Sequence, residues 1–297
     1  MARDWKALPV PHALTRPDRV PAARYYDPEF YELECERLWP RVWQMACRLE
    51  EIPRVGDYVE YENLGQSIIV LRLDDDTVKA FHNACRHRGM RLVQDRGSCR
   101  GGIVCPFHGW CYNLDGSNRF VYEPDLFDAS NLDPGDLRLL ECRVELWGGC
   151  AFICLDDDAP SLRDSIEPFA SFHDARGVER MRTEWWHSTV LPVNWKLAIE
   201  AFMEGYHVMQ THPQLISRSS DTGYAGSKSR DTTAYMGSDD VIESSLYFMR
   251  TLHEGIASMV LEKDIRVAEG LRDIELPADP EQASLEWNRR LNDAITA

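Results

Sequence analysis

Two stretches of this sequence, Cys85-Arg86-His87 and Cys105-Pro106-Phe107-His108, each place a cysteine close to a histidine. Seventeen residues, 88–104, separate them. Gly89 and Gly109 follow the two stretches, and glycine lets backbone amides approach a bound group because it has no Cβ. Two thiolates and two imidazoles can hold a two-iron, two-sulfide cluster, with the cysteines on one iron and the histidines on the other. A structural zinc ion is the alternative, since zinc also accepts two cysteines and two histidines.

The order of the ligands favours the cluster. Zinc fingers usually place their cysteines together and their histidines together on a ββα frame, whereas each pair here is mixed. The flanking sequence consists of short β-forming runs separated by glycine and aspartate, at residues 58–61, 67–73, 78–81 and 149–155. We therefore predict a small antiparallel β domain over residues 41–158, preceded by an arm and a helix over residues 1–40. That helix starts at Asp27-Pro28, because aspartate caps helices and proline suits their first position.

Residues 159–297 are predicted to form a second domain, which makes the fold class α+β. Residues 156–160, rich in aspartate and ending in proline, are predicted to be the linker before it. The expected elements are a helix at 162–172, a strand at 182–191, a helix at 194–210, a loop at 217–240 and helices at 244–268 and 281–296.

A second group of metal-binding residue types lies on the helix predicted at residues 194–210. Glu204 and His207 share one helix face, and His212 can fold back onto it where the helix ends. Two histidines and one carboxylate leave coordination positions open on iron(II), as oxygen-activating sites require. A solvated helix with two surface histidines is the alternative, because short motifs often match by chance.

Both groups resemble the motifs of Rieske ring-hydroxylating oxygenase large (alpha) subunits. The resemblance rests on residues 83–89, 105–110 and 112–116 and on Asn194-Trp195-Lys196 before the second group. Respiratory Rieske proteins carry two extra cysteines where Met90 and Phe107 stand here, so the oxygenase branch fits better. A glutamate at position 204, with this spacing, is more similar to the carnitine and glycine-betaine oxygenase branch.

The resemblance implies the metal centres of that family. Cys85, His87, Cys105 and His108 would hold a [2Fe–2S] cluster, and His207 and His212 would hold a mononuclear iron. Glu204 would bridge the two metals between neighbouring subunits. The family's third iron ligand, a carboxylate, has no matching motif here and is not assigned. The implied fold is a Rieske domain followed by an incomplete helix-grip α+β catalytic domain, which would leave apolar residues of the predicted helix exposed (Ile199, Phe202 and Met203).

The implied function is that of the terminal oxygenase of a multicomponent system. Electrons from NAD(P)H would arrive through a reductase, with or without a ferredoxin, and a small organic substrate, expected to be aromatic, would react with O2. Hydroxylation, dihydroxylation and demethylation all stay open. The resemblance further implies a homotrimer, with or without a small beta subunit. The alternative is a truncated, inactive chain or a one-electron carrier that retains only the cluster.

Composition sets the remaining expectations. Lys and Arg total 33 against 49 Asp and Glu, and the net charge of −16 argues against nucleic-acid or anionic-membrane partners. No apolar run is long enough to span a bilayer. The first residues lack an apolar signal core, so we predict a cytoplasmic protein. Of its nine cysteines, seven are expected to be small core hydrophobes: Cys35, Cys47, Cys99, Cys111, Cys142, Cys150 and Cys154.

Overall fold

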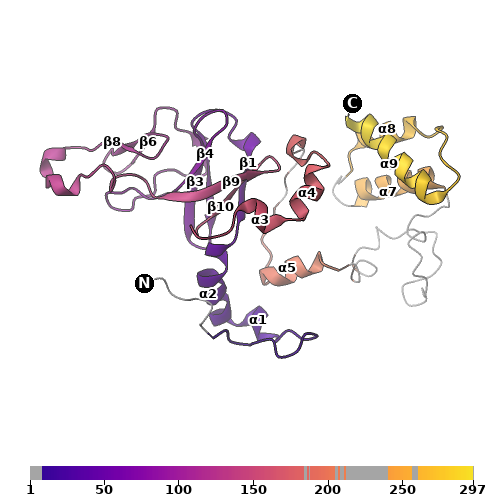
Figure 1. Ribbon diagram of the computed structural model, residues 1–297, viewed down its shortest axis with the longest axis horizontal. Coiled ribbons are helices and arrows are strands. Elements are labelled where there is room, and N and C mark those ends of the chain that lie inside the picture. Colours follow the sequence, from indigo (N-terminus) through magenta and orange to yellow (C-terminus); the bar gives the residue numbers. More distant parts are fainter. Residues whose placement is uncertain are drawn as a thin grey trace. The chain divides into compact units, whose positions relative to one another are not determined.

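The computed structural model describes residues 9–183, 186, 188–204, 207, 211, 240–255 and 260–296 (Figure 1). Two antiparallel sheets and several helices make up this part of the chain, so the predicted α+β fold class is confirmed. None of its helices is long and apolar enough to cross a bilayer.

The larger sheet has seven strands and contains the four β runs predicted from the sequence. Its order is β1 (Gln44–Arg48), β10 (Cys150–Cys154), β9 (Glu141–Trp147), β4 (Val78–His82), β3 (Gln66–Arg72), β2 (Asp57–Asn63) and β5 (Arg96–Ser98). Every neighbouring pair is antiparallel. Strand β3 lies inside the sheet, between β4 and β2, and is buried from Ile68 to Arg72, which explains its nearly continuous apolar sequence.

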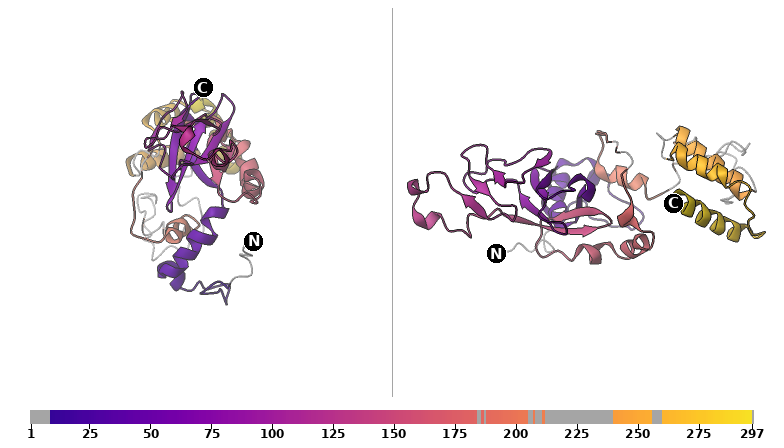
Figure 2. Two further views of the ribbon diagram at one scale, coloured as in Figure 1. Left: turned by 90° about the vertical axis from the view of Figure 1, so that its left-hand side faces the viewer. Right: turned by 90° about the horizontal axis from the view of Figure 1, so that it is seen from above.

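A smaller, three-stranded sheet lies beside the larger one at the end of the domain that carries the cysteine–histidine stretches (Figure 2). It consists of β6 (Ile103–Val104), β7 (Cys111–Tyr112) and β8 (Asn118–Phe120). Side chains from one face of β3 and β4, including Ile69 and Phe81, form one core with Cys85, Cys105 and the small sheet. The other face packs a second core with β1 and β10. The metal-binding stretches therefore border the first core.

The N-terminal helices are short. Helix α1 (Ala23–Tyr26) precedes α2 (Pro28–Arg37), and the Asp27 side chain accepts a hydrogen bond from the Glu29 amide at 3.0 Å, as the predicted cap requires. Short 3₁₀ turns occur along residues 39–180: η2 (Trp39–Arg41), η3 (Leu49–Glu51), η4 (Pro124–Leu126), η5 (Ala129–Asn131) and η6 (Val178–Arg180).

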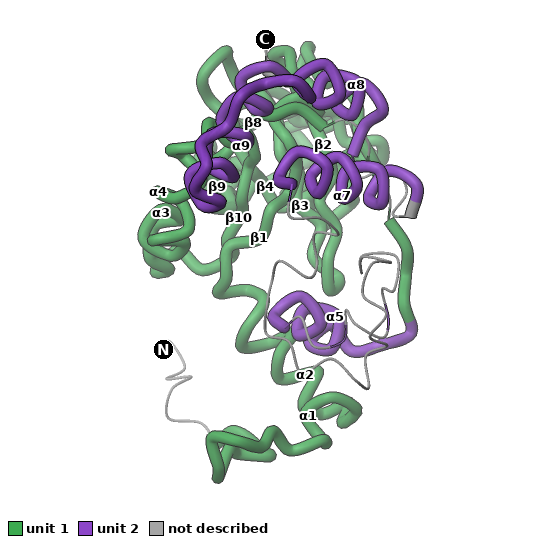
Figure 3. Tube along the Cα trace, turned by 90° about the vertical axis from the view of Figure 1, so that its right-hand side faces the viewer, with its two compact units in different colours: residues 1–191 green, residues 192–297 purple. Residues whose placement is uncertain are grey.

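The chain divides into two units, Met1–Leu191 and Pro192–Ala297 (Figure 3). The first unit contains both sheets and the α1–α4 helices, and the second contains α5 and α7–α9. The domain limits predicted from the sequence, at residues 40 and 158, stay predictions.

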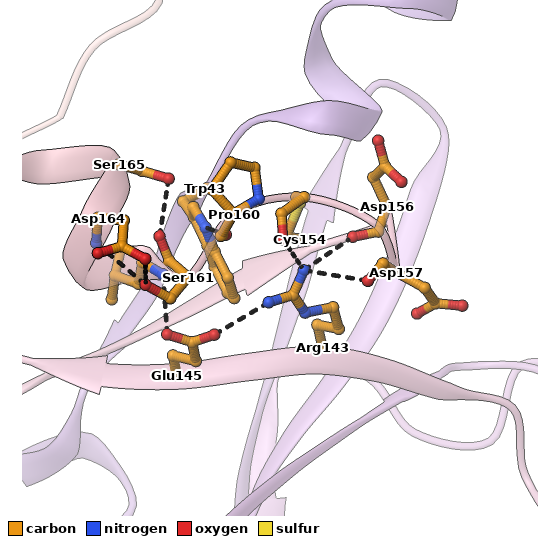
Figure 4. Close-up of polar contacts among 12 residues, drawn as sticks. Trp43, Arg143, Glu145, Cys154, Asp156, Asp157, Pro160, Ser161, Asp164 and Ser165 are labelled. Atoms are coloured by element: carbon orange, nitrogen blue, oxygen red, sulfur yellow. Dashed lines mark hydrogen bonds and ion pairs between the residues drawn. The ribbon is translucent and has the colours of Figure 1, made fainter.

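The segment predicted as a linker is held against the large sheet. Arg143 of β9 donates to the carbonyl oxygens of Asp156 and Asp157, both at 3.3 Å, and of Ala159 at 2.5 Å (Figure 4). The neighbouring Glu145 accepts from the Leu162 amide at 2.8 Å, at the start of α3 (Leu162–Ile166). These contacts order the turn after β10 despite its polar sequence.

Two expectations for the first unit are wrong in part. The helix predicted at 162–172 is two helices, α3 and α4 (Phe169–Asp174), because Glu167 is extended before Pro168, which restricts its conformation. The strand predicted at 182–191 is absent from the residues described there. No described strand pairs with this segment, and β propensity alone does not make a strand without a neighbour.

The second unit is helical in its described part. The helix predicted at 194–210 is wrong in its extent, because α5 (Trp195–Ala201) ends before Glu204 and the described residues 202–204 are not helical. Asn194 caps α5, since its side chain accepts from the Lys196 amide at 3.1 Å. The helix predicted at 244–268 is instead α7 (Val241–Gly255) and α8 (Glu262–Gly270), and the backbone of Leu261 before α8 is extended. Helix α9 (Pro280–Thr296) agrees with the prediction. The predicted loop at 217–240 lies outside the described residues except for Asp240.

Candidate metal centres

The two cysteine–histidine loops have the same backbone conformation, although their histidines stand at different positions. In each loop the cysteine N–H bonds the carbonyl five residues later, and the glycine N–H bonds the cysteine carbonyl. These bonds are Cys85 to Met90 (2.8 Å), Cys105 to Trp110 (2.8 Å), Gly89 to Cys85 (2.8 Å) and Gly109 to Cys105 (3.0 Å). His87, two residues after Cys85, and His108, three residues after Cys105, are thereby brought together as a pair.

Glycine is required where each loop turns back. Gly89 has φ +71° and Gly109 has φ +70°, in the region that other residues rarely adopt. A Cβ at either position would meet nothing within 4 Å in the protein. The space beside both loops is therefore open, which fits a bound group next to their amides.

The four candidate ligands lie together as two pairs. His87 Nδ1 lies 3.1 Å from His108 Nδ1, and both rings are half-exposed. Cys85 and Cys105 are buried, at 3% and 2% exposure, and their thiols contact each other. The pairs match the ligand set of a two-iron cluster in which each iron takes two protein ligands, with the imidazoles on the solvent side.

Charge and burial also suit metal binding. Burial, with smaller contributions from His108 and Arg88, lowers the pKa of His87 and so favours the neutral imidazole that ligates metals. Burial and the neighbouring Cys105 raise the pKa of the Cys85 thiol, an effect that a bound iron would reverse by stabilising the thiolate. The observed residues therefore fit a [2Fe–2S] group.

Two buried aromatic side chains, Trp110 and Tyr112, contact these ligands. The Trp110 ring, 3% exposed, stacks on His87 with centroids 4.9 Å apart and planes 10° apart. The Tyr112 hydroxyl lies 3.1 Å from Cys85 Sγ and accepts from the Arg86 amide at 3.0 Å. Met90 at the end of the first loop and Phe107 in the second are exposed.

The second candidate centre is described only in part. Glu204 Oε1 lies 2.7 Å from His207 Nδ1, and Glu204 Oε2 accepts from the His207 amide at 3.1 Å. A metal ion at His207 would therefore use Nε2, with the carboxylate orienting the ring. His212 lies outside the described residues. The described residues supply one histidine of this centre, so the iron site stays a prediction.

Apolar side chains before Glu204 are exposed, as the sequence predicts, although Phe202 and Met203 follow α5 and do not lie on it. Phe202 is 93% exposed, Met203 76% and Ile199 44%. 

The other seven cysteines divide by burial. Four are buried as expected: Cys47, Cys142, Cys150 and Cys154. Burial raises the pKa of Cys47 and Cys142 to about 12, which keeps them as thiols. The other three are half-buried: Cys35, Cys99 and Cys111.

Two family models match this chain. Residues 42–125 match the Rieske [2Fe–2S] domain, and residues 172–276 match the catalytic domain of the ring-hydroxylating alpha subunit. The chain belongs to the Rieske ring-hydroxylating oxygenase alpha-subunit family. The predicted resemblance is thus confirmed, and the two matches fall on the two groups of metal-binding residue types.

The relatives include the branch predicted from Glu204. The carnitine monooxygenase oxygenase subunit of Escherichia coli K12 is 30% identical over 202 residues, which cover 65% of this chain and 52% of that protein. The glycine betaine monooxygenase oxygenase subunit of Chromohalobacter salexigens is 32% identical over 198 residues, which cover 67% of this chain and 44% of that protein. The chain spans about half the length of these relatives.

Two solved Rieske oxygenases share the fold of about two thirds of this chain. A quaternary ammonium Rieske monooxygenase in complex with gamma-butyrobetaine has a TM-score of 0.61 and 28% identity, covering 65% of this chain and 56% of that one. Naphthalene 1,2-dioxygenase from Rhodococcus sp. bound to indole has a TM-score of 0.59 and 31% identity, covering 66% and 46%.

Sequence reasoning assigned no role to several residues around the first centre. Trp110 and Tyr112 belong to the stretches that carry the family resemblance, but only the fold shows that they contact His87 and Cys85. Glu60 and Asn83 also went unassigned. The one signal in the sequence was a polar residue within or just after a strand-forming run: Glu60 lies in the run 58–61, and Asn83 follows the run 78–81.

Proposed function

We propose that this chain is the terminal oxygenase component, or a part of it, of a multicomponent Rieske oxygenase. The observation that carries the proposal is the arrangement of one buried cysteine pair and one half-exposed histidine pair in a single centre. The cysteines place one side of a bound group in the core, and the histidines bring the other side to the surface, where an electron partner can approach.

In such a component, a [2Fe–2S] group held by Cys85, His87, Cys105 and His108 would supply single electrons, and iron held by His207 and His212 would supply dioxygen activation. The chain's own residues orient the ligands. Trp110 fixes the plane of the His87 ring by stacking, and the Tyr112 hydroxyl contacts the Cys85 sulfur.

Glu204 is proposed to connect the two centres. Its carboxylate contacts His207 within the chain, at 2.7 Å from Nδ1. A second hydrogen bond, to the exposed ring edge of a cluster histidine in a neighbouring subunit, would complete the bridge. This role requires an oligomer, and we propose the homotrimer implied by the family, with or without a small beta subunit.

The proposed partners are a reductase that uses NAD(P)H and, in some arrangements, a ferredoxin. The proposed substrate is a small organic molecule that reacts with O2. Aromatic compounds, predicted from the sequence, and quaternary ammonium compounds, the class on which the monooxygenase of known structure acts, are the two classes to test first. 

The proposal predicts the metal content of anaerobically purified protein. We expect about two irons and two acid-labile sulfides per chain from the first centre, with about one more iron if the second is filled. The visible spectrum of a histidine-ligated cluster should accompany them. Cys85→Ser and His108→Ala should each abolish that spectrum.

Cys35→Ser is the matched control, because Cys35 lies on α2, outside the core that holds the candidate ligands. It should keep the iron, the sulfide and the spectrum of the unaltered chain. A purified chain without acid-labile sulfide, or a Cys85→Ser variant with an unchanged spectrum, contradicts the proposal.

A further inference from the structure

The two cluster loops are anchored to the fold in different ways. The second loop, residues 105–110, closes a hairpin in which β6 pairs with β7 directly at its base, Ile103 with Tyr112 and Val104 with Cys111. The first loop follows β4, but residues 91–95 after it form no strand. The first loop therefore needs another anchor at its base.

The Asn83 side chain supplies the hydrogen bonds that a strand pair would supply. Its Oδ1 accepts from the amides of Leu92 and Val93 at 2.9 and 3.1 Å. Its Nδ2 donates to the Val93 carbonyl at 2.8 Å. Asn83 itself is fixed to β3 by its amide, which donates to the Ser67 carbonyl at 2.9 Å. The residue is 5% exposed and joins the two ends of the loop.

Glu60 of β2 fixes the same junction from the sheet. Its Oε1 accepts from Asn83 Nδ2 at 2.8 Å and from Arg91 Nε at 2.6 Å, and also from the Ser67 hydroxyl. Its Oε2 accepts from the Asp95 amide at 3.0 Å. The Glu60 side chain is 4% exposed, so these bonds replace water.

The charge on Glu60 is stabilised where it lies. Burial alone raises the pKa of this carboxyl, but hydrogen bonds from Ser67, Arg91 and Asn83 outweigh burial and lower the pKa below its ordinary value. The ion pair with Arg91 places a compensating cation at the far end of the same loop. Asn83, Glu60 and Arg91 thus form one connected polar cluster, which we name the loop clasp.

We propose that Asn83 and Glu60, through the loop clasp, are positioning residues for the first cluster loop and hold His87 in place opposite His108. The inference rests on the proposed function, because it concerns the same centre. The two histidines come from different loops, so their 3.1 Å separation depends on how firmly each loop is held. Loosening the first loop should weaken cluster retention and change the surroundings of His87.

Asn83→Asp tests the clasp with almost no change in volume. The new carboxylate oxygen replaces the Asn83 Nδ2 group, which donates to Glu60 and to the Val93 carbonyl. Three hydrogen-bond acceptors would then lie together in a buried site without a donor between them. We expect the cluster to be lost about tenfold faster than in the unaltered chain when a chelator is added, measured by visible absorbance. The electron paramagnetic resonance of the reduced cluster should also change, reporting altered histidine ligation.

Asn63→Asp is the matched control. Asn63 is a half-buried residue of β2 in the same sheet. Its Nδ2 donates to Gln44 Oε1 at 2.9 Å and does not contact a cluster loop. It should keep the resonance and the loss rate of the unaltered chain.

Glu60→Gln and Glu62→Gln provide an independent comparison that does not alter a residue next to Cys85. Both glutamates pair with Arg91, but only Glu60 reaches Asn83 and Asp95, and Glu62 is 57% exposed. We expect accelerated cluster loss in Glu60→Gln only, and partial rescue in Glu60→Asp, which keeps the charge.

Equal loss rates and equal resonance in Asn83→Asp and Asn63→Asp overturn the clasp, as do equal rates in Glu60→Gln and Glu62→Gln. An unaltered chain that carries no histidine-ligated cluster overturns the proposed function instead. The two failures are therefore distinguishable in one set of proteins.

Discussion

A single hydroxyl group links the second cluster loop to a ligand of the first. Tyr112 is fully buried, and burial and the nearby Cys85 raise its pKa, so the hydroxyl stays protonated. Because it already accepts from the Arg86 amide, its own proton is available to Cys85 Sγ at 3.1 Å. A hydrogen bond to a ligating sulfur withdraws negative charge from the cluster and raises its reduction potential.

Tyr112→Phe should therefore lower the reduction potential of the bound cluster by about 60 mV, if about 1.4 kcal/mol of the hydrogen bond depends on the redox state. A spectroscopic redox titration measures this shift. Tyr61→Phe removes a hydroxyl that bonds Gln44 at 2.9 Å in the other core and should leave the potential unchanged. Equal potentials in both variants would remove the role of Tyr112.

At this scale the sequence was informative only where residue type limits the chemistry. Cysteine and histidine at close spacing have few other uses, so the four candidate ligands could be named before the fold was known. Asn83 and Glu60 are common polar residues 23 positions apart, and their hydrogen bond exists only because β2 and β4 flank β3. No local pattern encodes such a contact.

The elements around the centre differ in how they are stabilised. Strands pair along their backbones, whereas the turn after β10 is held by one side chain, Arg143, through three backbone carbonyls. The guanidinium also lies 5.0 Å from the centre of the Trp43 ring, whose Nε1 donates to the Pro160 carbonyl at 3.0 Å (Figure 4). The planar guanidinium of arginine has five N–H donors in fixed directions and can bond several carbonyls at once, which the ammonium group of lysine cannot do in the same geometry.

Arg143→Lys should loosen residues 156–162 at a cost of about 1–3 kcal/mol in the free energy of unfolding. Amide hydrogen exchange in this segment should accelerate, while the cluster spectrum stays unchanged because β9 and β10 remain paired. Arg138→Lys is the control, since the Arg138 guanidinium donates to the carbonyl of Asp115 at 2.8 Å and not to residues 156–162. Unchanged exchange at residues 156–162 in Arg143→Lys would contradict this role.

Elements were predictable where local signals agreed with the tertiary environment. Asp27 caps its helix as expected, and the apolar run of β3 is a buried strand. The segment at 182–191 has strand-forming residues but no described partner strand, so its propensity is not realised. Long-range pairing decided that outcome, and a single sequence does not show it.

At the scale of the whole chain, the two units have separate hydrophobic cores. Both cores of the first unit consist of residues from its own sheets and loops. In the second unit α7, α8 and α9 share one core, centred on Leu246 and Trp287 at 0% and 1% exposure. Since these clusters share no buried residue among those that the structure describes, we expect damage to the helical core to spare the cluster domain.

Trp287→Ala tests this independence. Removing a fully buried tryptophan should cost the helical unit about 3–5 kcal/mol, a large part of the stability of a domain of this size. We expect the helical circular dichroism to fall and to lose cooperativity on heating, while iron, sulfide and the visible spectrum match those of the unaltered chain. Leu285→Ala on the exposed side of α9, where Leu285 is 60% exposed, should change neither signal. Loss of the cluster in parallel with the helices would show that the two units fold as one.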